Sequence, residues 1–367
     1  MSAEISLKRI NQLAIPALIA GVSEPILSLT DAAIIGNMDY NATESLAAGG
    51  IVTTFLSMLI WVLGQTRSAI SSIVSQYLGA ENLEAVKNLP AQAMFLITSL
   101  SLIIILVTYP FASEIFKLYN ASDTILNYSI TYYQIRVFGF PFTLFTIAVF
   151  GTFRGLQNTF YPMLIAITGA VANIILDIIL VYGVEGYVPA MHIEGAAYAS
   201  VIAQLIMAAL SAYYMLKKTD IPLLIKLPFN PEIKRFALMI INLFIRTIAL
   251  NVALDFGTSF ATKYGSVYIA AYTIAINLWF LGAFLIDGYA SAGNILSGKL
   301  LGAKAYNTLI ELSNKLIKYG ILVGSVIAVI GGLLYYPIGR LFTNDQQVLT
   351  EFYKIFWLVI AMQPLCA

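Results

Sequence analysis

The sequence has few of the side chains that form disulfides, bind metals or carry charge. Its 367 residues include one cysteine, Cys366, and one histidine, His192. A single cysteine excludes an internal disulfide, and a metal site built from cysteine and histidine would have too few ligands. Charged residues make up 11% of the chain, against about 25% in soluble proteins. The net charge of +1 provides no basic surface for nucleic acid, so we expect no metal, no cofactor and no nucleic-acid partner.

What the chain has instead is apolar sequence, since 59% of its residues are hydrophobic. A transmembrane helix needs about 20 apolar residues, and runs of that length recur from end to end. Lys8 and Arg9 precede a first run that is too long for the apolar core of a cleavable signal peptide. We therefore predict an all-α protein that crosses the lipid bilayer many times. The predicted spans are residues 10–36, 46–76, 91–112, 126–152, 162–183, 195–216, 236–261, 267–298, 314–336 and 347–367.

Basic residues outside these spans predict the orientation. With the N-terminus inside, most of them face the cytoplasm, in agreement with the positive-inside rule. The cytoplasmic set is Lys8, Arg9, Lys87, Arg154, Lys217, Lys218, Lys226, Lys234, Arg235, Lys299, Lys304, Lys315 and Lys318, and the outer set is Lys117, Lys263, Arg340 and Lys354. We therefore expect a cytoplasmic N-terminus.

The chain also repeats itself at a constant offset. Gln76-Tyr-Leu-Gly-Ala80 recurs as Lys299-Leu-Leu-Gly-Ala303, an offset of 223 residues (299 minus 76). The segment 115–119 recurs as 338–342 and Pro141 recurs as Pro364 at the same offset, while Asp31 and Asp255 are 224 residues apart. A constant offset over so long a stretch indicates an internal duplication.

Each repeat would contain six spans, and an even number of crossings returns the chain to its starting side. The two halves then share one orientation, with a pseudo-two-fold axis along the membrane normal. We predict an N-terminal lobe at 1–217, a cytoplasmic linker at 218–235 and a C-terminal lobe at 236–367. The repeat also leads us to expect about two further spans after residue 367, twelve in all, so that the second lobe is truncated here.

Two acidic residues stand out because they lie deep in predicted spans. Asp31 lies in the first span, and Asp177 lies in the fifth, where Asn173 precedes it by one helical turn on the same face. A carboxylate at mid-bilayer costs about 2.5–3.5 kcal/mol, so it is rare unless it has a function. Burial and neighbouring amides act oppositely on such a carboxyl and can poise it to bind and release a proton. We predict a proton relay; the alternative is a neutral aspartic acid tied permanently to a hydroxyl or amide.

The first span also contains two prolines and a second acid. Glu24 is seven residues before Asp31 and therefore shares its helix face, and Pro25 follows directly. Proline removes a backbone hydrogen bond and bends a helix, so Pro16 and Pro25 are candidate gating kinks. The alternative is a static kink with Glu24 facing a water-filled vestibule.

The second half has its own polar residues within spans. Asp255 and Asp287 are candidate members of an accessory network, although a structural ion pair with Arg246 would explain either acid equally well. Arg67 and Arg136 also fall within spans, and we interpret them as structural residues near the interface or in ion pairs.

Aromatic residues make up 13% of the chain, and aromatic faces bind flat organic cations. Membrane-interface belts and core packing explain most of them. Tyr272, Asn277 and Trp279 lie on one span and are candidates for a substrate cavity.

Several motifs together resemble those of MATE (multidrug and toxic compound extrusion) transporters. They are Leu29-Thr-Asp-Ala-Ala33, Asn173-x-x-x-Asp177, Gly151-Thr-Phe-Arg-Gly-Leu-Gln-Asn-Thr159 and the paired Leu-Gly-Ala turns; Arg246-Thr-Ile-Ala-Leu250 and Ile286-Asp-Gly-Tyr-Ala290 resemble the prokaryotic DinF-type branch. The resemblance implies two six-helix lobes around a V-shaped cavity. It also implies a proton-coupling site at Asp31, Asn173 and Asp177, joined by Ser200 with Gln204 nearby, and a bend at Pro16. Glu24-Pro25 and Asp255 depart from the pattern we expect of this family.

We therefore predict a monomeric antiporter of a bacterial cytoplasmic (inner) membrane that exports cationic or amphiphilic organic compounds by alternating access. The predicted coupling ion is H⁺, with Na⁺ as the alternative. A flippase for a lipid-linked precursor is the second candidate. An intramembrane aspartyl protease would need a Gly-x-Gly-Asp motif, which the sequence lacks, and we expect no enzyme.

Overall fold

The computed structural model describes residues 6–38, 41–121, 123–342 and 345–366. Within its helices, the side chains at 23–26, 28, 29, 255, 262 and 266 are not described. Three predicted residues, Glu24, Pro25 and Asp255, therefore lie outside the described side chains.

In these ranges the chain is built from helices, with one isolated β-bridge between Val184 and Val188. The α-helices are α1 (Leu7–Gly36), α2 (Ala42–Leu63), α3 (Thr66–Gly79), α4 (Leu89–Thr108), α5 (Ala112–Leu118), α6 (Asp123–Arg136), α7 (Phe140–Gly155), α8 (Phe160–Tyr182), α9 (His192–Lys218), α10 (Ile233–Tyr264), α11 (Ser266–Gly302), α12 (Tyr306–Leu333), α13 (Tyr335–Phe342) and α14 (Gln346–Cys366). Two 3₁₀ helices, η1 (Leu83–Val86) and η2 (Val137–Gly139), join them.

Among the described residues, 9 helical stretches are long and apolar enough to cross a membrane. The 30 residues of α1 also suffice, since an α-helix rises about 1.5 Å per residue. The prediction of an all-α, multi-pass membrane protein is confirmed. Two predicted spans are broken within their length: α2 and α3 meet at Gly64 and Gln65, and α6 and α7 are joined by η2.

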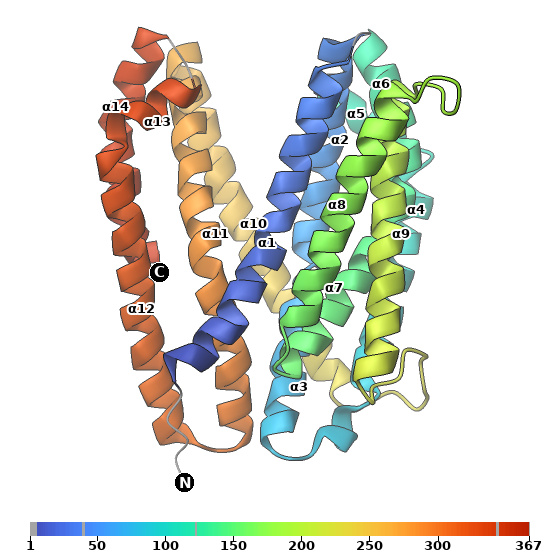
Figure 1. The fold of residues 1–367 in the computed structure, drawn as a ribbon, viewed down its shortest axis with the longest axis vertical. Coiled ribbons are helices and arrows are strands. Elements are labelled where there is room, and N and C mark those ends of the chain that lie inside the picture. Colours follow the sequence, from blue (N-terminus) through green and yellow to red (C-terminus); the bar gives the residue numbers. More distant parts are fainter. Residues whose placement is uncertain (1–5, 39–40, 122, 343–344, 367) are drawn as a thin grey trace.

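The helices form two bundles with α1 running between them (Figure 1). One bundle contains α2–α9 and the other α10–α14. The first half of α1 packs on α11 through Ile10, Leu13 and Ala14, whereas Ala20 packs in the first bundle against Phe150. Helix α1 therefore belongs to both lobes. Pro16 lies between these two sets of contacts.

The internal duplication is visible in the helix bounds. An offset of 223 residues carries the end of α3 at Gly79 onto the end of α11 at Gly302. The same offset carries Ala112, the first residue of α5, onto Tyr335, the first residue of α13, and Asp123 of α6 onto Gln346 of α14. The broken pair α2–α3 thus corresponds to the single long helix α11.

The ends of α3 and α11 cross at what we call the basal end of the molecule, where α1 also begins (Figure 1). An added Cβ at Gly79 would lie 2.7 Å from the carbonyl carbon of Lys299, and one at Gly302 would lie 2.6 Å from that of Gln76. The contact is reciprocal, because the offset relates Gln76 to Lys299 as it relates Gly79 to Gly302. Glycine at both positions lets the two backbones touch across the pseudo-two-fold axis.

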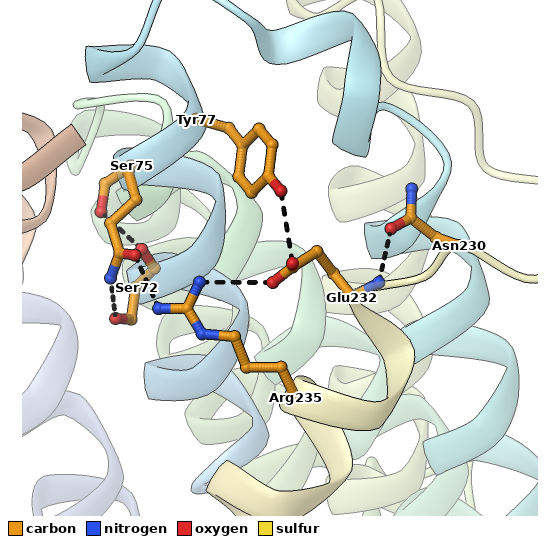
Figure 2. Close-up of polar contacts among 7 residues, drawn as sticks. Ser72, Ser75, Tyr77, Asn230, Glu232 and Arg235 are labelled. Carbon is orange, nitrogen blue, oxygen red and sulfur yellow. Dashed lines mark hydrogen bonds and ion pairs between the residues drawn. The ribbon is translucent and has the colours of Figure 1, made fainter. Parts of the chain in front are cut away.

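The segment between the lobes is anchored to the same place. Figure 2 shows Glu232 and Arg235, at the start of α10, reaching the end of α3. The Tyr77 hydroxyl donates to Glu232 Oε1 at 3.3 Å, and Arg235 Nη2 donates to the Gln76 side-chain oxygen at 2.6 Å. Arg235 and Glu232 also form an ion pair of 3.3 Å. The segment between the lobes and the crossing of α3 with α11 therefore form one continuous set of contacts at the basal end.

Candidate functional site

The predicted pair on α8 is formed as the sequence suggests. Asn173 Nδ2 donates a hydrogen bond of 2.9 Å to Asp177 Oδ2. Both side chains are buried, with 3% and 0% of their surface exposed. They face the interior of the first lobe, because lipid offers no partner to a carboxyl group.

Asp31 on α1 and Ser200 on α9 complete the group. The Ser200 hydroxyl donates to Asp31 Oδ2 at 3.5 Å, and the Asp31 and Asp177 carboxyls are close enough to influence each other electrostatically. Within the described part of the chain, Oδ1 of Asp31 and Oδ1 of Asp177 are buried without a hydrogen-bond partner. Three helices that are distant in sequence therefore bring two carboxyls, an amide and a hydroxyl together, with acceptor oxygens left over.

This group borders a cavity of about 170 Å³ inside the first lobe. Gln204, one turn after Ser200, also lines it, and a Cβ at Gly139 would overlap the Gln204 side-chain oxygen. The polar residues of its wall are Asp31, Thr53, Ser57, Arg67, Arg136, Thr143, Thr146, Asn173, Ser200 and Gln204.

Two arginines of this wall are interpreted from the sequence as structural residues, and the structure places both at the cavity. Arg67 on α3 and Arg136 on α6 line the cavity, and none of the ion pairs of the described residues includes either of them. Arg136 is the positive charge that acts on both Asp31 and Asp177. Their occurrence inside predicted spans is the signal in the sequence that could have identified them as cavity residues.

A third arginine, Arg154 at the end of α7, is buried at the boundary of the lobes. Its Nη1 donates to the Ser291 hydroxyl of α11 at 2.6 Å, and it is acted on by Arg67 and by Asp287. Nearby, Gln157 Nε2 donates to the Ile295 carbonyl at 2.7 Å. Asp287, a predicted accessory acid, is exposed on α11 and lies outside the cavity wall.

The three predicted cavity residues of α11 lie elsewhere. Asn277 is exposed and donates to the carbonyl of Thr273 on its own helix, at 2.9 Å. Trp279 packs on Phe280, with ring centres 5.2 Å apart. Tyr272 is half-buried, and its hydroxyl lies where a Cβ on Gly257 of α10 would stand. None of them lines the cavity of the first lobe. The described residues contain no group of three His, Cys, Asp or Glu side chains that could hold a metal ion.

The MatE family model matches residues 16–179 and 237–366 of the sequence. The chain belongs to the MATE family. Members of this family are transporters, not enzymes, and the family prediction is confirmed. The two matched segments correspond to the two lobes.

Individual relatives agree with this assignment. The DNA damage-inducible protein F of Escherichia coli is 26% identical over 360 residues, covering 96% of this chain and 76% of the relative. A probable multidrug resistance protein NorM of Shewanella oneidensis is 27% identical over 57% of this chain and 44% of its own. The match to DNA damage-inducible protein F confirms the predicted resemblance to the DinF-type branch.

Solved structures share the fold over nearly the whole chain. The crystal structure of a MATE protein in the bent conformation superposes with a TM-score of 0.89 at 22% identity, covering 98% of this chain and 79% of that one. The bent form of the Vibrio cholerae MATE transporter VcmN gives 0.88 at 19% identity, covering 97% and 80%. An outward-facing multidrug resistance MATE transporter gives 0.84 at 22% identity, covering 98% and 79%.

Proposed function

We propose that this protein is an H⁺-coupled antiporter that exports cationic or amphiphilic organic compounds. The observation that carries the proposal is the meeting of Asp31, Asp177, Asn173 and Ser200 beside one cavity, which Asp31, Asn173 and Ser200 line. Two adjacent carboxyls in a low-dielectric site do not both ionise readily, so the pair favours uptake of at least one proton. Asn173 and Ser200 donate to the ionised form and hold each carboxyl in place.

In this proposal the cavity binds substrate and protons in turn. Protons that arrive from outside neutralise Asp31 and Asp177 and release bound substrate outward. The lobes then part at the basal crossing of α3 and α11, and the protons leave to the cytoplasm. Pro16 lies where α1 changes from one lobe to the other, which suits it to bend as the lobes move.

The driving force is sufficient for export. One charge moving through 100 mV releases about 2.3 kcal/mol, which supports roughly a 40-fold concentration gradient. A pH difference or a second coupling ion would support a larger concentration gradient.

The proposed setting is a bacterial cytoplasmic membrane with a cytoplasmic N-terminus and a monomeric transporter. Lys8, Arg9, Lys87 and the residues between the lobes support this orientation, because the positive-inside rule places them in the cytoplasm. The basal crossing would then be the closed cytoplasmic side.

The test is transport in proteoliposomes without Na⁺. Vesicles that are acidic inside are diluted into rhodamine 123, a permanent organic cation, and dye uptake is followed as protons leave. We expect gradient-driven uptake by the wild type and its loss in Asp177→Asn and Asp31→Asn. Asp220→Asn, on an exposed residue of the interlobe segment, is the matched control. Full uptake by both cavity variants would refute the coupling site, and uptake that appears only with Na⁺ would assign Na⁺ as the coupling ion.

A further inference from the structure

The interlobe segment, residues 219–232 between α9 and α10, has apolar side chains on both of its sides. Ile221 and Leu223 pack against the core of the first lobe. Leu224, Leu227 and Phe229 point outward instead and are 81%, 73% and 50% exposed. These three lie outside the helical stretches that are long and apolar enough to cross the membrane. Large apolar side chains gathered on one short exposed stretch indicate an interaction surface.

A buried glutamine of α4 fixes this arrangement. Gln92 is fully buried, and its Nε2 donates to the backbone carbonyls of Lys226 and Pro228, at 2.7 and 3.1 Å. Its Oε1 accepts a hydrogen bond of 2.8 Å from the backbone N–H of Asn230. Breaking these bonds would leave a buried amide without partners, which is costly. The outward side chains, such as Leu227, are therefore held outward by the backbone that carries them.

The same bonds set the depth of the segment in the membrane. Gln92 lies in the first turn of α4 (Leu89–Thr108), which belongs to a membrane-length helical stretch. Phe95 and Leu96 follow one turn later and are exposed, so they contact lipid. One turn of an α-helix is about 5.4 Å long. The segment therefore lies within about one turn of lipid-facing side chains, at the boundary between headgroups and acyl chains.

Positive charge surrounds the exposed apolar side chains. Three exposed lysines belong to no ion pair of the described residues, and they are Lys217 and Lys218 at the end of α9 and Lys226 within the segment. The adjoining cavity of about 560 Å³ has two acids in its wall. Glu84 is paired with Lys87 at 2.8 Å, which leaves Asp220 against the three lysines. The surface is thus apolar and basic, which is complementary to an anionic lipid.

We propose that the interlobe segment is an anchor in the membrane interface that binds anionic phospholipid in the leaflet at the basal end. Leu224, Leu227 and Phe229 enter the upper part of the acyl chains, and the lysines bind lipid phosphates. A lysine can do this because its apolar stem lies along apolar surface while its ammonium reaches the headgroups. The depth favours lipid over a soluble protein, since the surface is level with the start of a membrane-crossing helix.

The anchor would act on the first lobe, because the segment is tied to α4. In the proposed orientation the leaflet at the basal end is the cytoplasmic one. The inference depends on neither the coupling ion nor the substrate, so it can fail or succeed independently of the proposed transport.

The experiment places a fluorophore on the segment. Cys366→Ala removes the single cysteine, and Leu227→Cys provides a new one that is labelled with bimane. The protein is reconstituted in phosphatidylcholine that contains a small fraction of nitroxide-labelled phosphatidylglycerol or, in parallel, of nitroxide-labelled phosphatidylcholine. The nitroxide lies near the top of the acyl chain, and its quenching of bimane is measured. Asn82→Cys is the control position, because it is exposed on the basal turn after α3.

We expect both lipids to quench the label on the segment more than the label at Asn82→Cys. Phosphatidylglycerol should quench it at least about threefold more than phosphatidylcholine, as attraction by several lysines implies, and salt should weaken this preference. Lys217→Gln combined with Lys226→Gln should lower the ratio at least about twofold. Lys8→Gln combined with Lys304→Gln removes the same charge from other exposed basal positions and should leave the ratio unchanged.

Two results would overturn the inference. Quenching on the segment no stronger than at Asn82→Cys would place the segment in water and leave its apolar side chains to a partner other than lipid. Equal quenching by the two lipids, or a ratio that persists without Lys217 and Lys226, would show that the surface does not recognise the charge of the headgroup. Neither result bears on the proposed transport function, which the uptake of dye tests separately.

Discussion

Replacing Gly79 with alanine would place a methyl group inside the contact between α3 and α11. The new carbon would overlap the carbonyl oxygen of Lys299 and lie 2.7 Å from its carbonyl carbon, whereas ordinary contacts are 3.4–4 Å. The neighbour is helix backbone and cannot rotate away, so the two helices must separate by roughly 1 Å. Overpacking of this kind costs about 1–3 kcal/mol.

That cost falls on one state of the proposed transport cycle. It raises the free energy of the arrangement with the basal end closed and leaves the open one unaffected. The population of the open arrangement should therefore rise roughly 5- to 150-fold. Gly302→Ala should have the same effect, because its added carbon meets Gln76 in the reciprocal position.

Thiol labelling measures this shift directly. Cys366, the single cysteine, is replaced by alanine, and Ser75, which is fully buried at the crossing, is replaced by cysteine. The rate of reaction with a maleimide added from the basal side then reports opening. We expect labelling to accelerate by the factor given above when Gly79→Ala is added. The control is Gly50→Ala, where no atom lies within 4 Å of an added Cβ. Equal rates in the two variants would refute the role of the crossing as the constriction.

Three further substitutions test other parts of the structure by thermal unfolding in detergent. Asn173→Ala removes the donor to the buried Asp177 carboxyl and should cost about 1–3 kcal/mol; an unchanged unfolding temperature would show that this hydrogen bond is dispensable. Gly195→Ala places a carbon 2.5 Å from a backbone oxygen of α8 and should destabilise by about 1–3 kcal/mol, and no loss would mean that α8 and α9 can move apart freely. Glu232→Gln removes a partly exposed ion pair with Arg235 and should cost less than about 1 kcal/mol, so a large loss would contradict the exposure seen here.

The spans and the Asn173–Asp177 pair could be predicted because both depend on local sequence. A membrane-crossing helix is identified by the length of an apolar run, and residues four apart on a helix share a face whatever surrounds them. The contact of Asp31 with Ser200 is different, since it depends on how α1 and α9 pack. That contact could be expected only from the family resemblance.

The place of Arg67 and Arg136 in the cavity wall could not be predicted, for a physical reason. Arg136 is the last residue of α6, just before η2, and Arg67 follows the break at Gly64 and Gln65. A change of helix geometry resets the direction of the side chains that follow, so periodicity within a span does not carry across it. Both arginines lie at such breaks. There the sequence indicates how deep a residue lies in the membrane but not the direction in which its side chain points.

The duplication supplies the last test, because the two lobes share a fold but not their charges. The 223-residue offset relates Arg136 to Val359 and Arg67 to Ala290, so the second lobe lacks both arginines at the related positions. Asp31 nevertheless has an acid, Asp255, one residue from its counterpart.

If coupling depends on the group at the first-lobe cavity, Asp255 should not replace it, because Val359 and Ala290 stand where that group has Arg136 and Arg67. We therefore expect Asp255→Asn to keep proton-driven dye uptake within about twofold of the wild type, a change of less than about 0.4 kcal/mol, whereas Asp31→Asn abolishes it. Both variants remove one carboxyl from a helix that begins its lobe, so the pair controls for the general effect of the substitution. Loss of uptake in Asp255→Asn, with Asp31→Asn active, would instead assign the coupling site to the second lobe.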